Sequence, residues 1–497
     1  MTALLGAPLA PGIEEGWKSL STAAAAVAEE ELGRAPRKNK DWFDSNLQGI
    51  REVVDTKNKA LAASLSNPSS IYLRNKYKEA RSNCQRALRN MENAWWLKLA
   101  AEIQGYADAG DLQNFHAALK QVYGPSDRSL APVRSRAGDV LLTGKSDILS
   151  RWKEHYSVLL NTDNPCDWQI MDLIPQKDPI PQMDDMPTLQ EVEHAVQTLK
   201  NHKSPGVDGI PAEVWKHGGP TILRRLHDLI CRIWEAEEVP QQWKDAKLIS
   251  IYKKKGDRAI CGNSRGIALL SVAGKVLAKV MLIRINKHIV DSTCPESQCG
   301  FRRNRGTTDM IFVARQLQEK CREQRMNLCM AFVDLSKAFD TVNRAMLWEI
   351  MRRSGCPNKF TNIVRDFHDE ISASVAVGGE ETESFGVGVG VKQGCVMASV
   401  IFNIYLAATT QLFRESFPAE RGVGLTYRLD GSVFNLDRLK ARTKVSRDLI
   451  TELQYADDCA LVAHTPEDLQ ASLTALCNIY NALGLAVNTD KTEILYQ

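Results

Sequence analysis

Residues 453–463 read Leu-Gln-Tyr-Ala-Asp-Asp-Cys-Ala-Leu-Val-Ala, an apolar run that two adjacent carboxylates interrupt. Apolar side chains alternate through this stretch, and most positions between them are apolar too. This pattern predicts two short buried strands joined by a tight turn at Asp457 and Asp458. Two unit charges about 4 Å apart repel each other by roughly 4 kcal/mol at an effective dielectric near 20. Either a bound cation offsets this repulsion, or one carboxylate faces solvent in an ordinary turn.

A second apolar run ends in an acid. Residues 329–335 read Cys-Met-Ala-Phe-Val-Asp-Leu, which is the length of a strand, and apolar residues at helical spacing follow over 347–351. Asp334 is therefore expected at the carboxyl end of a strand, where open sheets usually bind ligands. If it meets Asp457 and Asp458 at one sheet edge, their oxygens suit Mg²⁺. Two such ions about 3.5–4 Å apart would serve an in-line displacement at phosphorus.

Length and composition bound the remaining possibilities. A chain of 497 residues predicts roughly two to four domains, and 44% apolar with 25% charged residues excludes a mainly disordered or fibrous protein. No stretch of about 18 apolar residues is present, so no membrane span is expected, and Glu14 and Glu15 argue against a leader peptide.

The net charge of +3 does not by itself indicate a nucleic-acid binder. The 12 cysteines include no Cys-x-x-Cys pair, which favours reduced thiols over a zinc site.

The N-terminal part, residues 1–162, is predicted to be helical and partly basic. Its first 33 residues, rich in alanine and proline, are interpreted as a frayed helical or disordered lead. Apolar residues recur at helical spacing over 71–106 and predict a long basic amphipathic helix. Its cations form either the solvated face of a bundle or an arm that contacts nucleic acid. Residues 34–40 are a weak nuclear-import candidate, and the expected location is the nucleus or the cytoplasm.

Residues 163–187, rich in proline and aspartate, are the expected linker. Thr188 follows with Glu191 three residues later, a capping box that predicts the start of a helix. From there a dense region continues to the last residue without a further linker.

The two acidic segments resemble a known family. Residues 332–340 (FVDLSKAFD) and 455–458 (YADD) are similar to the two catalytic motifs of reverse transcriptases, more specifically those of non-LTR (LINE-type) retrotransposons. Further segments resemble the family's other motifs in the same order: 203–211 (KSPGVDGIP), 251–257 (IYKKKGD), 263–271 (NSRGIALLS), 298–302 (QCGFR), 390–395 (GVKQGC) and 488–492 (NTDKT).

The resemblance implies an α+β fold, the fingers and palm of a right-hand polymerase with a small antiparallel palm sheet. It implies fingers over 188–328, a palm over 329–497, and a reverse transcriptase domain over about 230–497. The implied activity is RNA-directed DNA synthesis, in which two Mg²⁺ ions, or Mn²⁺ as a substitute, join dNTPs to a DNA primer on an RNA template. The chain reaches its last residue where a thumb would be expected, and nothing upstream resembles the endonuclease that often accompanies this polymerase.

The resemblance also implies roles for three cations. Lys253 and Arg265 would approach the incoming triphosphate, with arginine offering two parallel contacts and lysine a point charge. Lys491 would protonate the departing pyrophosphate. An exposed charged loop and a lone surface charge are the alternative interpretations of Lys253 and Lys491. Among the carboxylates, Asp457 is the stronger metal ligand, and Asp458 either binds metal or orients the primer end.

Three further positions would surround the nucleotide. Phe339 stands where the family keeps an aromatic ring that crowds the ribose 2′ position, which favours deoxynucleotides; packing in the core is the alternative. Gln393 and Gly394 fall in the segment that contacts template and nucleotide, where glycine permits close backbone approach. A simple strand-to-helix turn is the alternative there. Two departures from the family pattern are Ser264, where an aromatic is usual, and residues 397–399, where a proline is common.

Two other functions remain as alternatives. One is a weak or inactive nucleic-acid-binding remnant of such an element, whose binding would fall steeply with salt and ignore Mg²⁺. The other is an RNA-templated RNA polymerase. Phe339 and the Tyr-Ala-Asp-Asp sequence disfavour it, because a bulky ring excludes a 2′-hydroxyl and Gly-Asp-Asp would be expected at the turn.

Overall fold

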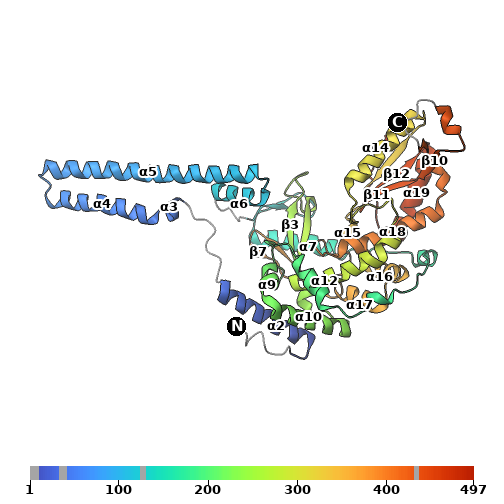
Figure 1. Ribbon diagram of the computed structural model, residues 1–497, viewed down its shortest axis with the longest axis horizontal. Coiled ribbons are helices and arrows are strands. Elements are labelled where there is room, and N and C mark those ends of the chain that lie inside the picture. Colours follow the sequence, from blue (N-terminus) through green and yellow to red (C-terminus); the bar gives the residue numbers. More distant parts are fainter. Residues whose placement is uncertain (1–9, 33–41, 124–129, 430–435) are drawn as a thin grey trace. The chain divides into compact units, whose positions relative to one another are not determined.

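The computed structural model describes residues 10–32, 42–123, 130–429 and 436–497. The chain divides into two compact units, one of residues 1–28 with 130–497 and one of residues 29–129 (Figure 1). The possible nuclear-import segment at 34–40 lies outside the described residues. Within the described ranges, no helix combines the length and apolar character that crossing a bilayer requires.

The smaller unit is built from helices α3 (Trp42–Ser45), α4 (Leu47–Ser66), α5 (Ile71–Asp108) and α6 (Leu112–Tyr123). The long helix predicted over 71–106 is confirmed as α5. It begins where the Ser70 hydroxyl accepts a hydrogen bond from the backbone N–H of Leu73 at 3.3 Å, which satisfies one of the donors left open at a helix start. Cys84 and Leu99 of α5 are buried, while its basic side chains are exposed.

Most of α2 (Ile13–Leu32) belongs to the larger unit, which includes residues 1–28. A helix was one of the two forms expected for the alanine-rich lead, but over residues 13–28 it is packed on the core and is neither frayed nor disordered. Trp17 and Leu20 are buried against the main core. The Trp17 ring lies 5.3 Å from that of Trp243, and its indole N–H donates to the Gln242 side chain at 2.7 Å. Composition alone does not predict the packing of this helix, because its burial depends on residues more than two hundred positions away.

Residues 163–187, expected as a linker, pack against the same core. They form two short 3₁₀ helices, η1 (Trp168–Leu173) and η2 (Pro181–Met183). Met171, Ile174 and Met183 are buried there. The capping box at Thr188 and Glu191 is confirmed, and it starts α8 (Leu189–Gln197).

The other helices of the larger unit are α7 (Lys145–Leu159), α9 (Ala212–His217), α10 (Gly219–Ala236), α11 (Gln241–Lys244), α12 (Val272–Ile285), α13 (Asp291–Thr293), α14 (Thr307–Glu323), α15 (Ala338–Thr341), α16 (Arg344–Arg353), α17 (Asn358–Asp366), α18 (Ala398–Ser416) and α19 (Pro466–Ala482). Two small hairpins pair β1 (Val133–Arg134) with β2 (Leu141–Leu142) and β9 (Val423–Arg428) with β10 (Val445–Ile450). The fold therefore mixes helices and sheets, as α+β predicts.

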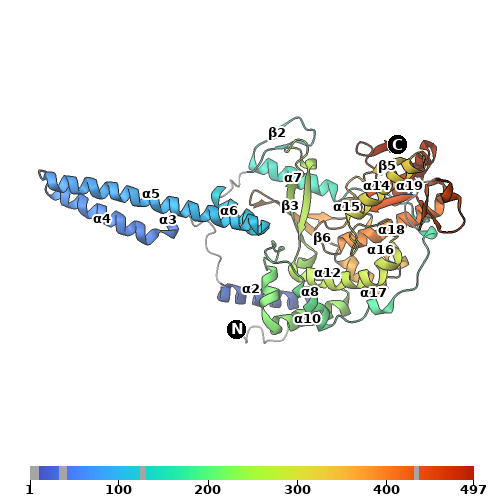
Figure 2. The same ribbon diagram turned by 45° about the horizontal axis from the view of Figure 1, so that its top comes forward.

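Sheet I has the strand order β11-β12-β5-β13, and every neighbouring pair is antiparallel. Its strands are β5 (Cys329–Val333), β11 (Glu452–Tyr455), β12 (Asp458–Ala463) and β13 (Glu493–Tyr496). The two acidic segments of the sequence therefore lie side by side, since β5 and β12 are neighbours. Figure 2 labels β5 in the same part of the molecule as α14 and α19.

Sheet II contains β3 (Ala246–Tyr252), β4 (Ser264–Leu269), β6 (Ile371–Val377), β7 (Glu380–Glu381) and β8 (Phe385–Val387). Strand β3 is antiparallel to β4 and parallel to β6, while β7 and β8 both pair with β6. Helix α7 covers this sheet through Ile148, Trp152 and Tyr156.

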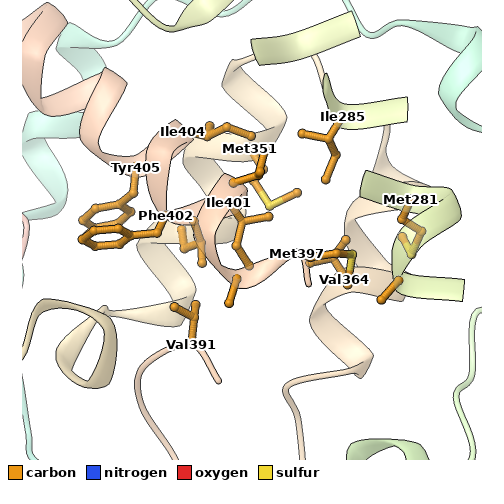
Figure 3. Packing of buried hydrophobic residues seen from close by; sticks show 14 of the residues in the cluster. Met281, Ile285, Met351, Val364, Val391, Met397, Ile401, Phe402, Ile404 and Tyr405 are labelled. Carbon is orange, nitrogen blue, oxygen red and sulfur yellow. The ribbon is translucent and has the colours of Figure 1, made fainter. Parts of the chain in front are cut away.

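The main core surrounds α18, of which most residues are buried. Ile401, Phe402 and Tyr405 of this helix pack among Met281 and Ile285 of α12, Met351 of α16 and Val364 of α17 (Figure 3). Sheet I also faces this core through Ala331 and Leu461, both fully buried. The sheet is thereby fixed to a rigid helical layer, which holds the residues at its open edge in place.

Candidate active site

The hairpin predicted at 453–463 is confirmed. Strands β11 and β12 pair from Tyr455 with Asp458 to Glu452 with Leu461. Ala456 and Asp457 form the turn, and Asp458 is the first residue of β12. Ala456 has a φ of 56°, the left-handed region that residues other than glycine seldom adopt.

Asp334 lies at the same edge of sheet I. Strand β5 pairs with β12 up to Val333 opposite Cys459, so Asp334 and Asp458 are the next residues on neighbouring strands. Neighbouring strands are about 5 Å apart. The structure therefore brings Asp334, Asp457 and Asp458 together at one end of the sheet.

The electrostatics of these carboxylates show that they interact. Burial raises the pKa of Asp457, and the nearby charge of Asp334 raises that pKa further. Burial likewise raises the pKa of Asp458, with smaller contributions from the charges of Asp457 and Asp334. Because these like charges lie at one edge, a cation placed among the three carboxylates would be stabilised.

One protein cation already lies at this edge. Lys491 places its Nζ 3.1 Å from Oδ2 of Asp334. The loop that carries it is held by the Asn488 N–H, which donates to the Asp334 carbonyl at 2.7 Å. Across the residues that the structure describes, no three His, Cys, Asp or Glu side chains form a group that could hold a metal ion as they stand. In this arrangement Asp334 pairs with the Lys491 ammonium.

A cationic cleft adjoins the carboxylates. Lys253 and Arg265 line it from the β3–β4 hairpin, and Lys337 and Lys491 line it from the side of sheet I. Burial lowers the pKa of Lys253, and the charges of Lys491 and Arg265 lower it further, while Asp340 and Asp334 raise it. This concentration of positive charge beside carboxylates suits a polyphosphate that carries divalent cations.

The ring of Phe339 lies in α15 and is half-buried. Its centre is 4.4 Å from that of Phe402 and 6.1 Å from that of Phe301. The ring thus packs on the core along one side, and this contact fixes its position. The structure is compatible with both of the roles expected for it.

Gln393 and Gly394 lie where the segment after β8 crosses sheet II. The Gln393 side-chain NH₂ donates to both carboxylate oxygens of Asp340, at 3.0 and 3.1 Å. Gly394 has a φ of 125°, and a Cβ there would lie 2.4 Å from the carbonyl oxygen of Ala268. Glycine is therefore required at 394 by the approach of β4, whatever else the turn contacts.

Asp340 is a residue whose importance the sequence reasoning missed. Asp340 is half-buried, and burial raises its pKa to about 6, although Lys337, Gln393, Lys253 and Arg265 all favour the charged form. Its position six residues after Asp334 was visible in the sequence. Its burial was not, because burial depends on Gln393, which is brought there by the fold.

The raised pKa of Asp340 predicts a pH-dependent stability. An aspartate that titrates near 3.9 when unfolded and near 6 when folded opposes folding in its ionised form. That penalty is complete above pH 6, shrinks as the pH falls from 6 to 4, and is absent below both values. Asp340→Asn should therefore gain about 1–2 kcal/mol relative to wild type at pH 7.5, and that gain should be smaller at pH 4.5. Urea unfolding at the two pH values measures this difference. A wild-type–variant difference that is the same at both would contradict the assignment.

Comparisons with known proteins identify the region that carries the site. Residues 251–497 match the family model described as reverse transcriptase (RNA-dependent DNA polymerase). The chain is 24% identical over 318 residues to an uncharacterised 149 kDa protein of the TX1 transposon of Xenopus laevis, covering 62% of this chain and 23% of that protein.

Two further relatives come from Drosophila melanogaster. One is the retrovirus-related Pol polyprotein of a type-2 retrotransposable element, 25% identical over 58% of this chain and 24% of that protein. The other is the RNA-directed DNA polymerase of the mobile element jockey, 25% identical over 44% of this chain and 24% of that protein. The chain thus spans about a quarter of the length of the relatives it matches.

Proposed function

Because residues 251–497 belong to the reverse transcriptase family, in the form found in non-LTR retrotransposons, we propose that this chain is an RNA-directed DNA polymerase. Its substrates would be an RNA template, a DNA primer and dNTPs. The reaction is nucleotidyl transfer, in which the primer 3′-oxygen attacks the α-phosphorus of the dNTP and pyrophosphate leaves.

One observation supports this proposal most strongly. Asp334, Asp457 and Asp458 come from separate segments and lie at one edge of sheet I, next to a cleft lined by Lys253 and Arg265. The carboxylates would bind the metal cations, and the lysine and arginine side chains would bind the negatively charged phosphates, so the two sides together suit a metal-bound triphosphate. Sheet I would then be the palm, whose strands all lie within the palm segment over 329–497. Sheet II would belong to the fingers: β3 and β4 come from the fingers segment over 188–328 and β6, β7 and β8 from residues beyond it, so fingers and palm would interleave along the chain.

The chemistry of the donor set suits two Mg²⁺ ions, with Mn²⁺ as a substitute. Asp334 and Asp457 would hold the ions, and Asp458 would complete the site or orient the primer end. Bound there, the ions would stabilise the negative charge that develops on the transferred phosphoryl group. Their binding requires Asp334 to exchange its contact with Lys491 for the metal, because the ammonium now lies on that carboxylate.

Displaced from Asp334, Lys491 would lie within the same cleft and donate a proton to the departing pyrophosphate. Lys253 and Arg265 would bind the β- and γ-phosphates. Phe339 would crowd the ribose 2′ position, with Phe402 holding its ring in place. Gln393 and Gly394 would border the base pair, with Asp340 fixing the orientation of the Gln393 amide.

Primer extension tests this function. The purified chain should extend a DNA primer on an RNA template with dNTPs and Mg²⁺, and EDTA should stop the reaction. Binding of primer–template without extension, falling steeply with salt and indifferent to Mg²⁺, would instead identify an inactive nucleic-acid-binding remnant. Preferential incorporation of ribonucleotides would identify an RNA polymerase.

Arg265→Gln should raise the KM for dNTP by about tenfold, because loss of a charge-assisted phosphate contact corresponds to about 1.5–3 kcal/mol. Steady-state extension with varied dNTP measures this, and the affinity for primer–template should change little. Arg258→Gln is the matched control, since Arg258 is exposed in the connection between β3 and β4 and is not among the residues that line the cleft. An equal effect of the two substitutions would remove Arg265 from the triphosphate site.

A further inference from the structure

The side chain of Gln298 is completely buried behind the turn that carries Asp457. Its Oε1 accepts hydrogen bonds from the backbone N–H of Ala456 and of Gly300, both at 2.8 Å. Its Nε2 donates to the Ala456 carbonyl at 3.2 Å and to the Gln454 side chain at 3.3 Å. One amide therefore binds both the N–H and the C=O of the residue that precedes Asp457.

The backbone around Gln298 pairs with β11 through a single isolated bridge. The Cys299 N–H donates to the Gln454 carbonyl at 2.9 Å, and the Gln454 N–H donates to the Ser297 carbonyl at 2.8 Å. Gln298 and Gln454 are thus joined by a parallel bridge. This pairing fixes the backbone of Gln298 next to the turn.

Gly300 brings this segment against the turn. A Cβ at 300 would lie 2.2 Å from the backbone nitrogen of Ala456, so only glycine fits at this distance. The Gly300 carbonyl accepts a hydrogen bond from Asn403 of α18, which is itself fully buried.

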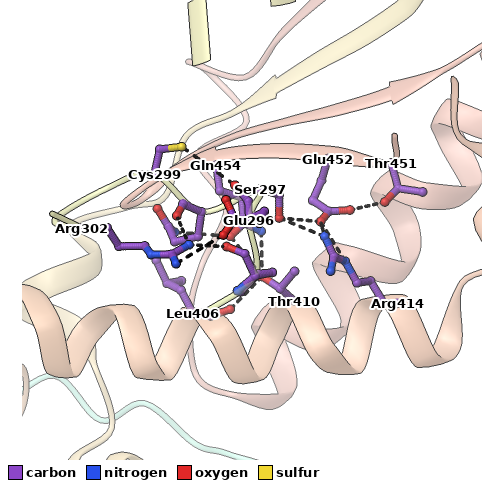
Figure 4. Close-up of polar contacts among 12 residues, drawn as sticks. Glu296, Ser297, Cys299, Arg302, Leu406, Thr410, Arg414, Thr451, Glu452 and Gln454 are labelled. Carbon is purple, nitrogen blue, oxygen red and sulfur yellow. Dashed lines mark hydrogen bonds and ion pairs between the residues drawn. The ribbon is translucent and has the colours of Figure 1, made fainter. Parts of the chain in front are cut away.

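A polar network anchors this arrangement to α18 (Figure 4). The side chains of Thr410 and Gln454 are hydrogen-bonded, with Gln454 Nε2 donating at 2.8 Å. Farther along β11, the carboxylate of Glu452 is 1% exposed and pairs with Arg414, whose guanidinium also donates to Ser297 at 3.0 Å. The turn is therefore held from behind by side chains of the rigid helix at the centre of the core.

Two forces act against the conformation of this turn. A left-handed φ at a residue with a Cβ costs about 1 kcal/mol or more. The three carboxylates lie at one edge of sheet I, and repulsion between their like charges favours spreading of that edge. The hydrogen bonds of Gln298 to Ala456 oppose both, because they form only while the left-handed turn is present.

We propose that Gln298 is a positioning residue that fixes the Asp457 carboxylate in its metal-binding place by holding the peptide groups of Ala456. The inference rests on the proposed function in one respect, that Asp457 binds the divalent cations of the reaction. Gln298 itself touches neither metal nor nucleotide; it acts through the turn.

Gln298→Met tests the proposal, because methionine is similar in length and removes all four hydrogen bonds. In hydrogen-exchange experiments on the metal-free protein, a peptide covering 453–459 should exchange at least tenfold faster than in wild type. The dissociation constant for Mn²⁺, measured by electron paramagnetic resonance without substrates, should rise at least tenfold. In primer extension, kcat should fall at least thirtyfold while the affinity for primer–template stays within twofold.

Gly300→Ala is the second variant, since a Cβ there would lie 2.2 Å from the Ala456 nitrogen and 2.9 Å from Oε1 of Gln298, and so disturbs the same contact without changing the Gln298 side chain itself. This variant should also raise the dissociation constant for Mn²⁺. If Gln298→Met does not fold, Gly300→Ala alone tests the proposal. Thr361→Val is the matched control. Thr361 is equally buried, but its hydroxyl donates only to the Pro357 carbonyl at 2.9 Å, one turn earlier along α17. This variant should keep the wild-type Mn²⁺ affinity and kcat.

The outcomes distinguish the positioning role of Gln298 from the proposed polymerase function. Unchanged Mn²⁺ affinity in both Gln298→Met and Gly300→Ala would overturn the positioning role, whether or not the wild type extends primers. Weakened Mn²⁺ affinity in a chain whose wild type extends no primer would overturn the proposed function and support the positioning role. A loss of affinity in Thr361→Val as large as in Gln298→Met would show a general loss of packing and overturn the proposal.

Discussion

Asp457→Asn is expected to lower primer extension by at least about a thousandfold while the protein stays folded. The substitution keeps the shape of the side chain and removes the charge that would bind the metal ion. Since each 1.36 kcal/mol of lost transition-state stabilisation is tenfold in rate, this corresponds to about 4 kcal/mol. An electrostatic contribution of that size is ordinary for phosphoryl transfer, in which positioning and charge provide most of the catalysis.

The same substitution should not destabilise the fold. Burial and the charge of Asp334 raise the pKa of Asp457, which means that its ionised form is disfavoured in the folded protein. A neutral amide removes that penalty, so the variant should unfold at the wild-type urea concentration or above it at pH 7.5. Single-turnover extension and urea unfolding, measured on one preparation, separate chemistry from folding.

Asp490→Asn is the control for loss of one nearby negative charge. Asp490 is exposed on the loop that carries Lys491 and lies outside the sheet edge. Its activity should stay within about threefold of wild type. A thousandfold loss in both variants, or in neither, would count against a special role for Asp457.

Arg344→Met is expected to produce the largest loss of stability, about 3–5 kcal/mol, because a buried multiple hydrogen-bond donor is removed. The Arg344 guanidinium donates to four backbone carbonyls: Gly390 at 2.8 Å, His368 at 2.5 Å, Val387 at 2.9 Å and Val389 at 3.2 Å. Burial lowers its pKa to about 10, so it stays charged at neutral pH. Methionine fills much of the volume but leaves four buried acceptors without their donor.

Equilibrium unfolding in urea measures this effect. Arg365→Met is the matched control, because Arg365 is 54% exposed and pairs only with Asp369 one turn away on the surface. Exposed pairs of this kind contribute about 0–1 kcal/mol, so the control should shift stability by less than about 0.5 kcal/mol. A loss below about 1 kcal/mol in Arg344→Met would show that the carbonyls find other donors. The dNTP KM should also rise, since Arg344 holds the segment that leads to Gln393.

The local features of the fold could be predicted because their causes are local. The capping box at Thr188 needs only Glu191 three residues on, and the long helix α5 follows from apolar spacing along one segment. The hairpin at 453–463 follows from apolar residues around a turn. By contrast, composition suggested a loose lead before residue 33 and a linker at 163–187, whereas Trp17 and Met183 are buried in the core. Burial of such segments depends on distant partners that no local pattern contains.

The candidate site likewise has features that the sequence predicts and features that depend on the fold. The sequence by itself determined which carboxylates and cations are present. It also determined that Asp334 ends one strand and that Asp457 and Asp458 lie at a tight bend, because charge and strand periodicity depend only on residues that are adjacent in the chain. Only the tertiary structure decided that β5 and β12 are neighbouring strands and that Lys491 pairs with Asp334. It also decided that Asp340 packs against Gln393 and that the Gln298 side chain is hydrogen-bonded to Ala456. These contacts join residues tens to more than one hundred and fifty positions apart. Their energies come from burial and strand pairing across the whole molecule, so they exist only after the chain has packed.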